Sequence, residues 1–143
     1  DAILIDAFGS LFTVPTHLTT VEAVTQFHRI LADDGVIIFN LGAAITGDAS
    51  KFLNAELRTY KQVFPQVHLF KVNPDYPDTR LQNLIIVASK STRPPNSTND
   101  APTIAALLSH RYSHEIKPDD PTLTDDLAPV EYYNSIAQNL YLS

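Results

Sequence analysis

The sequence contains no cysteine, no methionine and no tryptophan. Without cysteine there can be no disulfide, no thiolate metal site and no cysteine nucleophile, and this composition fits a reducing compartment, so we expect a cytoplasmic protein. Long apolar runs are also missing, since none reaches the roughly 18 residues that cross a bilayer. The chain opens on Asp-Ala-Ile-Leu-Ile-Asp with no basic flank, so we expect no signal peptide in this segment and no membrane contact by it.

Basic residues are scarce as well. There are 10 Lys and Arg against 16 Asp and Glu, for a formal net charge of -6. Nucleic-acid backbones are bound by clustered Lys and Arg, so nucleic acid is not an expected partner. The 143 residues, 44% of them apolar, suffice for one compact core. Because there is no initiator methionine and an apolar run starts at the second residue, we expect a piece of a longer protein.

Two short apolar runs predict strands that are covered on both faces of a parallel sheet, at residues 2–5 and 36–39. Between them, apolar residues recur at helical spacing. Thr19 and Glu22 suit a capping box at the start of this helix, and Gly35 suits its end. The pattern therefore predicts a strand, a crossover helix and a second parallel strand.

A second helix is predicted between Asp48, as its cap, and Phe64, because an apolar stripe runs along this segment and Pro65 follows it. Residues 67–72 and 84–88 are rich in strand-forming residues. The turn-rich segment between them is too short for a crossover helix, so the two strands should pair as an antiparallel hairpin.

Residues 91–102 are rich in Pro, Ser, Thr and Asn and predict a linker. It would separate a main domain at residues 1–90 from a helical extension at residues 103–143 that packs on the same domain. Helices are expected at residues 103–113 and 131–142. His110 and His114 stand four apart on the first of these, a spacing that can bind a metal, but no cysteine and no H-E-x-x-H pattern supports it. A solvated helix face is the favoured interpretation, and no metal is expected.

Several short motifs, in one order along the chain, resemble those of spermidine-synthase-like proteins, the polyamine aminopropyltransferases. An acidic residue ends the first strand and a Pro-x-His-Leu stretch leads into the helix. The matching segments are D-A-I-L-I-D-A-F at residues 1–8, V-P-T-H-L-T-T at 14–20, D-G-V at 34–36, V-F-P at 63–65, Y-P at 76–77, L-T-D-D at 123–126 and A-P-V-E at 128–131. Each motif is weak alone, but their shared order covers about residues 1 to 132.

The resemblance implies the C-terminal half of a Rossmann-type, S-adenosylmethionine-dependent methyltransferase fold. That is an α/β class with a partial sheet: two parallel strands with a crossover helix, a second helix, a terminal antiparallel hairpin, and C-terminal helices. The first half normally brings a glycine-rich turn for the nucleotide. The four glycines here show no G-x-G spacing. We therefore expect no cofactor bound by this segment, and decarboxylated S-adenosylmethionine or S-adenosylmethionine as co-substrate of the intact protein.

The implied reaction is aminopropyl transfer to a small-molecule amine. Asp6 matches the family position whose carboxylate holds the amine and accepts its proton, and Asp6 with Ala7 would also face the co-substrate. The alternative role of Asp6 is to cap the following turn. Typical family members carry a second aspartate three residues later, where this chain has Gly9. The lost charge should weaken diamine binding by about 1 to 3 kcal/mol in a desolvated site.

Other candidates each have a structural alternative. Tyr76 matches a tyrosine that lines the amine pocket, or it is an exposed turn residue. Gln82, with Asn83, could line the same pocket or simply close the hairpin. His17 could bind near the pocket floor, although fixing its loop onto the sheet is the favoured role. Residues 125–126, both aspartates, are best explained by a turn.

Three functions remain open at this stage. The first is a part of an aminopropyltransferase that is inactive alone. The second is a non-catalytic relative used for assembly or small-molecule binding, suggested by Gly9. The third is a small-molecule methyltransferase. We also expect a homo-oligomer, because the strand at residues 2–5 would form an exposed sheet edge, with the helix that contains Phe27 near the contact.

Overall fold

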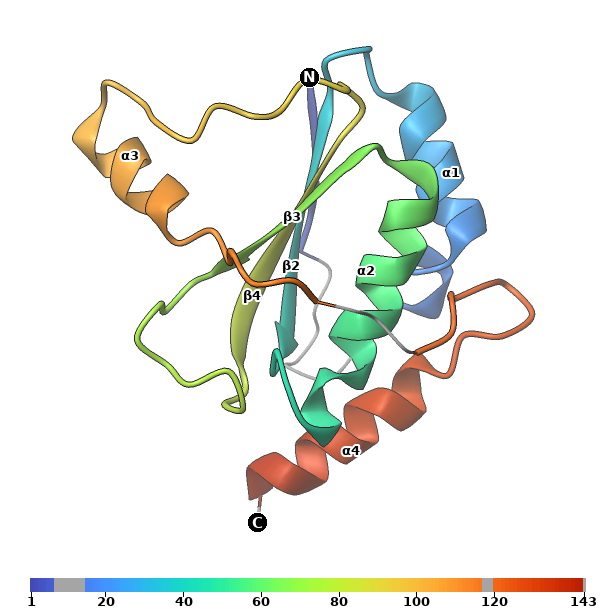
Figure 1. Ribbon diagram of the computed structural model, residues 1–143. Coiled ribbons are helices and arrows are strands. Elements are labelled where there is room, and N and C mark those ends of the chain that lie inside the picture. The colour runs from blue at the N-terminus through green and yellow to red at the C-terminus, as the bar shows by residue number, and fades with distance from the viewer. Residues whose placement is uncertain (7–14, 117–119, 143) are drawn as a thin grey trace.

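A four-stranded sheet in the order β1-β2-β4-β3 forms the centre of the computed structural model, which describes residues 1–6, 15–116 and 120–142 (Figure 1). β1 and β2 are parallel, whereas β4 is antiparallel to both of its neighbours, β2 and β3. The strands are β1 (Ala2–Ile5), β2 (Val36–Ala43), β3 (Gln66–Lys71) and β4 (Gln82–Ser89). The predicted parallel pair and the terminal antiparallel hairpin are therefore confirmed.

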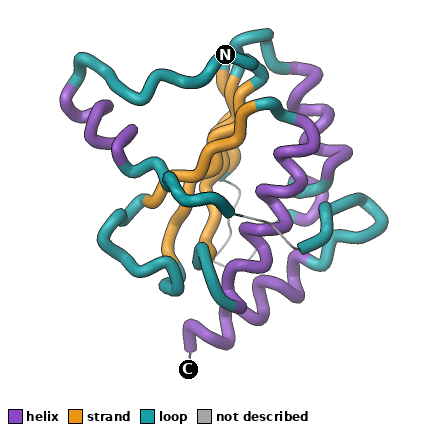
Figure 2. The backbone as a smooth tube through the Cα atoms, viewed as in Figure 1, coloured by secondary structure: helices purple, strands orange, loops and turns teal. Residues whose placement is uncertain are grey.

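Helices lie on both sides of this sheet, but unequally. Figures 1 and 2 show α1, α2 and α4 on one side of the sheet and α3 on the other, at the end of a long loop. The elements are α1 (Val21–Ile30), α2 (Lys51–Val63), α3 (Pro102–Ser109) and α4 (Val130–Leu142), with short 3-10 turns η1 (Thr16–Leu18) and η2 (Asp48–Ser50). No helix within the described ranges is long and apolar enough to cross a membrane.

The core lies between the sheet and the helices α1 and α2. On β2, the fully buried Ile37, Phe39 and Leu41 alternate with half-buried residues, as expected when one sheet face is covered. The stripe predicted on α2 meets this face, and the ring of Tyr60 stacks on that of Phe39 with centroids 5.9 Å apart. Each such large side chain contributes about 1.5–3 kcal/mol by leaving water. Packing against the sheet therefore stabilises α2.

The C-terminal segment also contributes to this core. Leu123 and Val130 are fully buried and belong to the same cluster as the α2 stripe. The amide of Val21 donates to the carbonyl of Leu123 at 2.8 Å, and the amide of Leu123 donates to the Thr59 hydroxyl at 3.0 Å. Residues near position 123 thus join the first turn of α1 to α2.

The predicted helix starts are wrong in detail. α1 is capped by Thr20, whose hydroxyl accepts from the Ala23 amide at 3.3 Å, and not by Thr19. Glu22 does not close a capping box, because its carboxylate accepts from the backbone amide of Asp125 at 3.1 Å. Asp48 does not cap α2 either: it begins η2, and α2 starts three residues later. A cap one residue later, a tertiary partner for Glu22 and an extra 3-10 turn replaced the expected arrangement.

α3 is shorter than predicted. It ends at Ser109, and His110 is already its C-terminal cap. The next residues run along the outer edge of β3, where the Tyr112 amide donates to the Leu69 carbonyl at 2.8 Å and Phe70 forms a bridge with Arg111. His110 and His114 are therefore not on one helix face, because pairing with β3 replaced the last helical turn.

Gly35 lies where neighbouring atoms leave little room for a side chain. Among the described residues only Gly47, in the loop that leads to α2, has a positive φ angle. At Gly35 an added Cβ would lie 2.6 Å from the Asp1 carboxylate and 2.9 Å from the Leu31 side chain. The predicted helix-stop role is thus a matter of space and not of a left-handed conformation.

Candidate functional site

Three segments meet at the edge of the sheet where the parallel strands have their carboxyl ends: the loop after β2, the turn between β3 and β4, and the end of α4 (Figure 1). They enclose a cavity of about 560 Å³. Its walls are Thr46, Gly47, Asp48 and Ala49; Tyr76, Thr79, Arg80, Leu81 and Gln82; and Ala137, Leu140 and Tyr141. Ligands of open α/β sheets bind at this edge, so the cavity is the candidate site.

Two of the predicted substrate-binding residues, Tyr76 and Gln82, line this one cavity. The Tyr76 ring carries the guanidinium of Arg80, which lies 3.8 Å from the ring centroid. Gln82 is 7% exposed, and neither its amide nitrogen nor its amide oxygen has a hydrogen-bond partner among the described residues. A buried unpaired amide is costly, and a polar ligand could relieve that cost.

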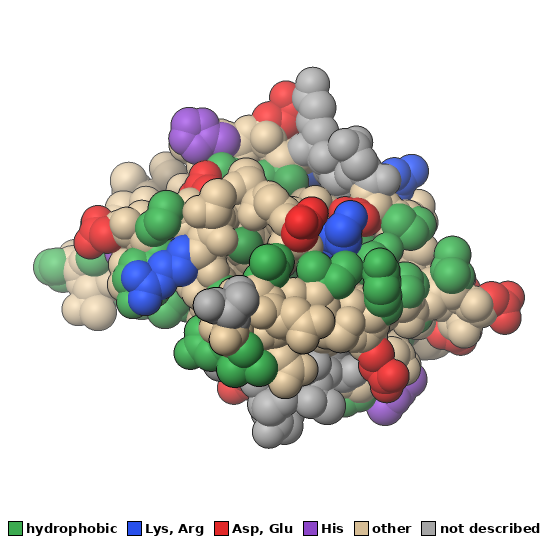
Figure 3. Space-filling model, turned by 90° about the horizontal axis from the view of Figure 1, so that it is seen from below, with side chains coloured by type: hydrophobic (Ala, Val, Ile, Leu, Met, Phe, Trp, Pro, Cys, Tyr) green, Lys and Arg blue, Asp and Glu red, His purple; other side chains and the backbone are tan. Residues whose placement is uncertain are grey.

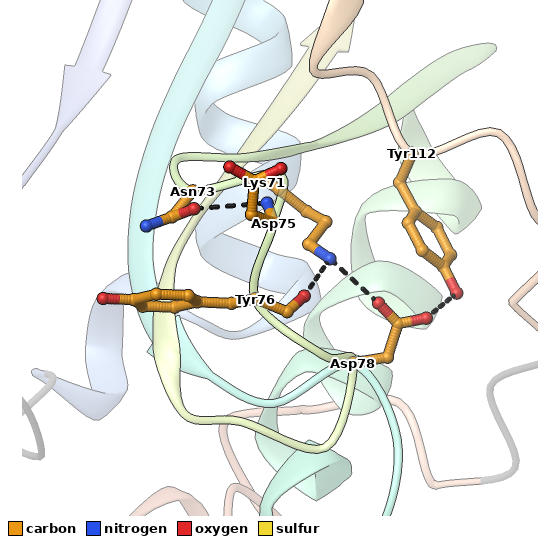
Figure 4. Close-up of polar contacts among 6 residues, drawn as sticks. All are labelled: Lys71, Asn73, Asp75, Tyr76, Asp78 and Tyr112. Atoms are coloured by element: carbon orange, nitrogen blue, oxygen red, sulfur yellow. Dashed lines mark hydrogen bonds and ion pairs between the residues drawn. The ribbon is translucent and has the colours of Figure 1, made fainter.

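The turn that carries Tyr76 is held by a polar hub around Asp78. The Lys71 ammonium donates to the backbone carbonyl of Tyr76 and, at 3.1 Å, to one carboxylate oxygen of Asp78. The other oxygen accepts from the Tyr112 hydroxyl at 2.7 Å. Figure 4 shows the Tyr76 ring pointing away from this hub while its carbonyl points into it. The hub therefore orients the turn through the backbone carbonyl of Tyr76, and the Tyr76 ring takes no part in the hub.

The same hub holds the opposite wall of the cavity. The backbone carbonyl of Asp78 accepts from the amides of Ile45 and Thr46 at 2.8 and 3.1 Å. The hydrogen bond from Tyr112, followed by the hydrogen bond and the charge of Lys71, lowers the pKa of Asp78 although partial burial opposes the shift. Burial and the bond to Asp78 raise the pKa of Tyr112 to about 12. Asp78 is thus an anion at neutral pH and Tyr112 a neutral donor.

Asp6 follows β1 at the same edge of the sheet. It is exposed, and one of its carboxylate oxygens accepts from the Asn40 side-chain amide at 3.0 Å. Phe39 on β2 pairs with Ile5 on β1, and Asn40 is the next residue of β2, as Asp6 is the next residue after β1. Asp6 is not a wall residue of the cavity near Tyr76. Its role as catalytic base stays a prediction.

His17 is exposed in η1 and lines a different hollow, of about 590 Å³, together with Glu22 and Asp125. The structure does not bring it together with Tyr76 or Gln82. Asp125 accepts from the hydroxyl of Thr20, the α1 cap, at 2.6 Å. The expected turn at residues 125–126 is present and also supports α1. No group of three potential metal ligands occurs in the parts of the chain that the structure covers.

Ala7 and Gly9, the other positions that the family motif singles out, lie outside the described residues. Sequence reasoning missed Arg80, Asn40 and the Asp78 hub. Arg80 follows the Tyr-Pro motif closely and could have been noted as a charge near Tyr76. The partner of Asp78 lies 34 residues away in the sequence and left no local signal.

The fold defines the chain as an α/β protein of the Rossmann-type methyltransferase class, because β4 is inserted antiparallel between β2 and β3 in an otherwise parallel arrangement. A solved structure is similar to it: a probable spermidine synthase from Corynebacterium glutamicum, with 26% identity and a TM-score of 0.56 over 75% of this chain and 36% of that chain.

Two curated proteins are similar in sequence. An N-terminal histidine N-methyltransferase of Emericella nidulans is 33% identical over 60% of this chain and 15% of its own length. A polyamine aminopropyltransferase of Vibrio vulnificus is 35% identical over 50% of this chain and 22% of its own length. No family model matches. The chain thus spans about a fifth or less of these curated relatives, and its resemblance to spermidine-synthase-like proteins of the methyltransferase fold is confirmed.

Proposed function

We propose that this chain is the acceptor-binding part of a transferase that moves an aminopropyl group from decarboxylated S-adenosylmethionine to an amine. The observation that carries the proposal is the cavity at the carboxyl edge of the sheet, where Tyr76 and Gln82 lie together. Asp6 ends a strand at the same edge, with Asn40 beside it. Similarity to the Vibrio aminopropyltransferase supports this class of reaction.

Asp6 is the catalytic base in this proposal. An ammonium has no lone pair, so the acceptor nitrogen must lose a proton to attack the carbon beside the sulfonium. The new C–N bond forms as the C–S bond breaks, the electron pair moves to sulfur, and the proton goes to the Asp6 carboxylate. The amide of Asn40, 3.0 Å from Asp6, orients that carboxylate. Nucleotide-binding residues would come from outside these 143 residues, so the chain alone would be inactive.

The test is the mass of the product that the natural full-length protein makes from an amine and either co-substrate. We expect an aminopropyl increment with the decarboxylated form, and a loss of about 100-fold or more in kcat/KM on Asp6→Asn. Asp100→Asn, an exposed acid in the loop before α3 and outside the matching motifs, is the matched control. Full activity of Asp6→Asn would contradict the role of Asp6.

Methyl transfer is the second candidate, favoured by the similarity to the Emericella N-methyltransferase. A product heavier by one methyl group, formed from S-adenosylmethionine in the same assay, would identify methyl transfer in place of aminopropyl transfer. If the full-length protein binds neither co-substrate in calorimetric titration, a non-catalytic relative becomes the better explanation, as Gly9 in place of a second acid suggests.

A further inference from the structure

The cavity at Tyr76 has one acidic and one basic wall residue. Asp48 lies in the loop after β2 and Arg80 in the turn before β4, so the charges of the walls sum to zero. A diamine carries two positive charges at neutral pH and is best held by a surplus of carboxylates. Balanced walls instead suit a ligand that carries one charge of each sign.

Arg80 already covers the Tyr76 ring. Its guanidinium lies 3.8 Å from the ring centroid, which is where an ammonium would sit in a cation–π contact. A second cation bound at the Tyr76 ring would be repelled by the positive charge of the Arg80 guanidinium. Within the described residues Arg80 forms no ion pair. Its N–H donors can therefore bind a carboxylate with both oxygens, the geometry that guanidinium groups favour.

Gln82 points to the same ligand class. Both polar atoms of its buried side-chain amide lack partners among the described residues. The oxygen needs a donor and the nitrogen needs an acceptor. A diamine supplies donors only and would leave the nitrogen unpaired, whereas an amine that also carries a carboxylate supplies both. The amide is shielded from solvent, so this contact involves a rotation of the side chain toward the cavity.

We propose that the acceptor has a zwitterionic end, with Arg80 binding its carboxylate, Asp48 its ammonium and Gln82 both, while a further amine of the same acceptor reacts at Asp6. This assignment rests on the proposed acceptor-binding function of the cavity and narrows its substrate class. Figure 3 shows acidic, basic and apolar side chains intermixed on the end of the molecule seen from below, without a field of one sign on that face. That surface is compatible with a ligand whose bound end carries one charge of each sign.

The test compares two probes that differ in one group, 1,4-diaminobutane and ornithine, which is the same diamine with an added carboxylate and amino-acid geometry. Binding to the chain is followed by NMR titration, with the side-chain amide signals of Gln82 as the reporter. We expect ornithine to bind about tenfold more tightly than the diamine, the difference expected for a charge-assisted pair. Arg80→Gln should abolish this preference, whereas Arg93→Gln, the same charge change on an exposed segment, should keep it.

Each other outcome overturns the zwitterion assignment in a distinguishable way. If the diamine binds as tightly as ornithine, and Arg80→Gln leaves the ratio unchanged or favours the diamine, the cavity is a diamine site and the acceptor-binding function stands. If neither probe moves the Gln82 signals at millimolar concentration, the cavity is not an acceptor site and both proposals fail.

Discussion

Glu56 is a fully buried carboxyl group in the middle of α2. Its two oxygens have no hydrogen-bond partner among the described residues, and burial raises its pKa well above the ordinary value. The buried Tyr60 lies one helical turn further along, and its pKa is raised by burial and then by the charge of Glu56. An uncompensated buried charge is costly, so burial favours the protonated form of Glu56 in the folded chain.

This burial predicts a stability that falls as pH rises. The folded pKa lies above the unfolded value of 4.5, so the contribution of Glu56 is fully present below about pH 4 and is lost progressively as the pH rises toward the folded pKa. Glu56→Gln has no proton to lose and should be more stable than the wild type at neutral pH, by a margin that grows with pH. Urea unfolding of both proteins from pH 4 to 9 measures this difference.

Because the two proteins differ in one titrating group, the other ionisations cancel in the comparison. A difference in unfolding free energy that stays constant across this pH range would mean that Glu56 is ionised or hydrated in the folded chain.

At the scale of elements, Asp78 connects four parts of the chain. Its carboxylate binds Lys71 on β3 and Tyr112 beyond α3, and its carbonyl binds the loop after β2 through Ile45 and Thr46. These bonds hold both walls of the candidate cavity. Loss of the carboxylate charge should therefore loosen the turn that carries Tyr76 as well as reduce stability.

Asp78→Asn should destabilise the chain by about 1.5–3 kcal/mol, the value of one hydrogen bond to a charged group. The pKa of Asp78 is lowered in the folded chain, so its contribution is present above about pH 4 and is lost as the pH falls through the folded value. Acid unfolding of the wild type should therefore be steeper than that of the variant. Denaturant unfolding between pH 2 and 7 measures both effects.

Tyr112→Phe is the matched control, since it removes one bond to Asp78 and leaves the ion pair with Lys71. Its destabilisation should be smaller at neutral pH. In the wild type, the pKa of Tyr112 is about 12, so ionisation of its hydroxyl breaks this bond and lowers the free energy of unfolding only above about pH 10. Tyr112→Phe has no hydroxyl to ionise and should not show that alkaline loss of stability. Equal stability of Asp78→Asn and the wild type at every pH would contradict the hub.

At the scale of the whole molecule, the two outer edges of the sheet differ. Residues 110–112 run along the outer edge of β3 and satisfy two of its backbone groups, through Leu69 and Lys71. No described segment pairs with the outer edge of β1, where Leu4 is 72% exposed. Open strand edges with apolar side chains pair with other chains.

We therefore expect the chain to self-associate through β1, with α1 near the contact. Leu4→Lys should shift it toward the monomer, because a charge on an edge strand opposes pairing. Leu142→Lys is the control: Leu142 is 73% exposed but lies at the end of α4. Sedimentation velocity at micromolar concentration measures the distribution. A wild-type monomer, or equal effects of the two substitutions, would contradict association through β1.

The candidate site was predictable only in part. The Tyr-Pro motif indicated Tyr76, and a polar pair at the start of the last predicted strand indicated Gln82. Asp6 was indicated by the end of a strand. The partners that complete the site were not predictable: Tyr112 binds Asp78 across 34 residues, and Asp125 binds Thr20 across 105. Such bonds depend on where folded elements meet. The local sequence around either residue does not predict the contact.

The sequence by itself determined the order of strands and helices, because burial imposes a period of two on strands and of 3.6 on helices, and both periods are local. It also determined the resemblance to spermidine-synthase-like proteins. Only the tertiary structure decided which residues cap α1, where α3 ends and which side chains share the cavity. These outcomes depend on competition between local bonds and long-range ones. Glu22 binds the Asp125 amide instead of closing a capping box, and the Leu69 carbonyl accepts from the Tyr112 amide where α3 was expected to continue.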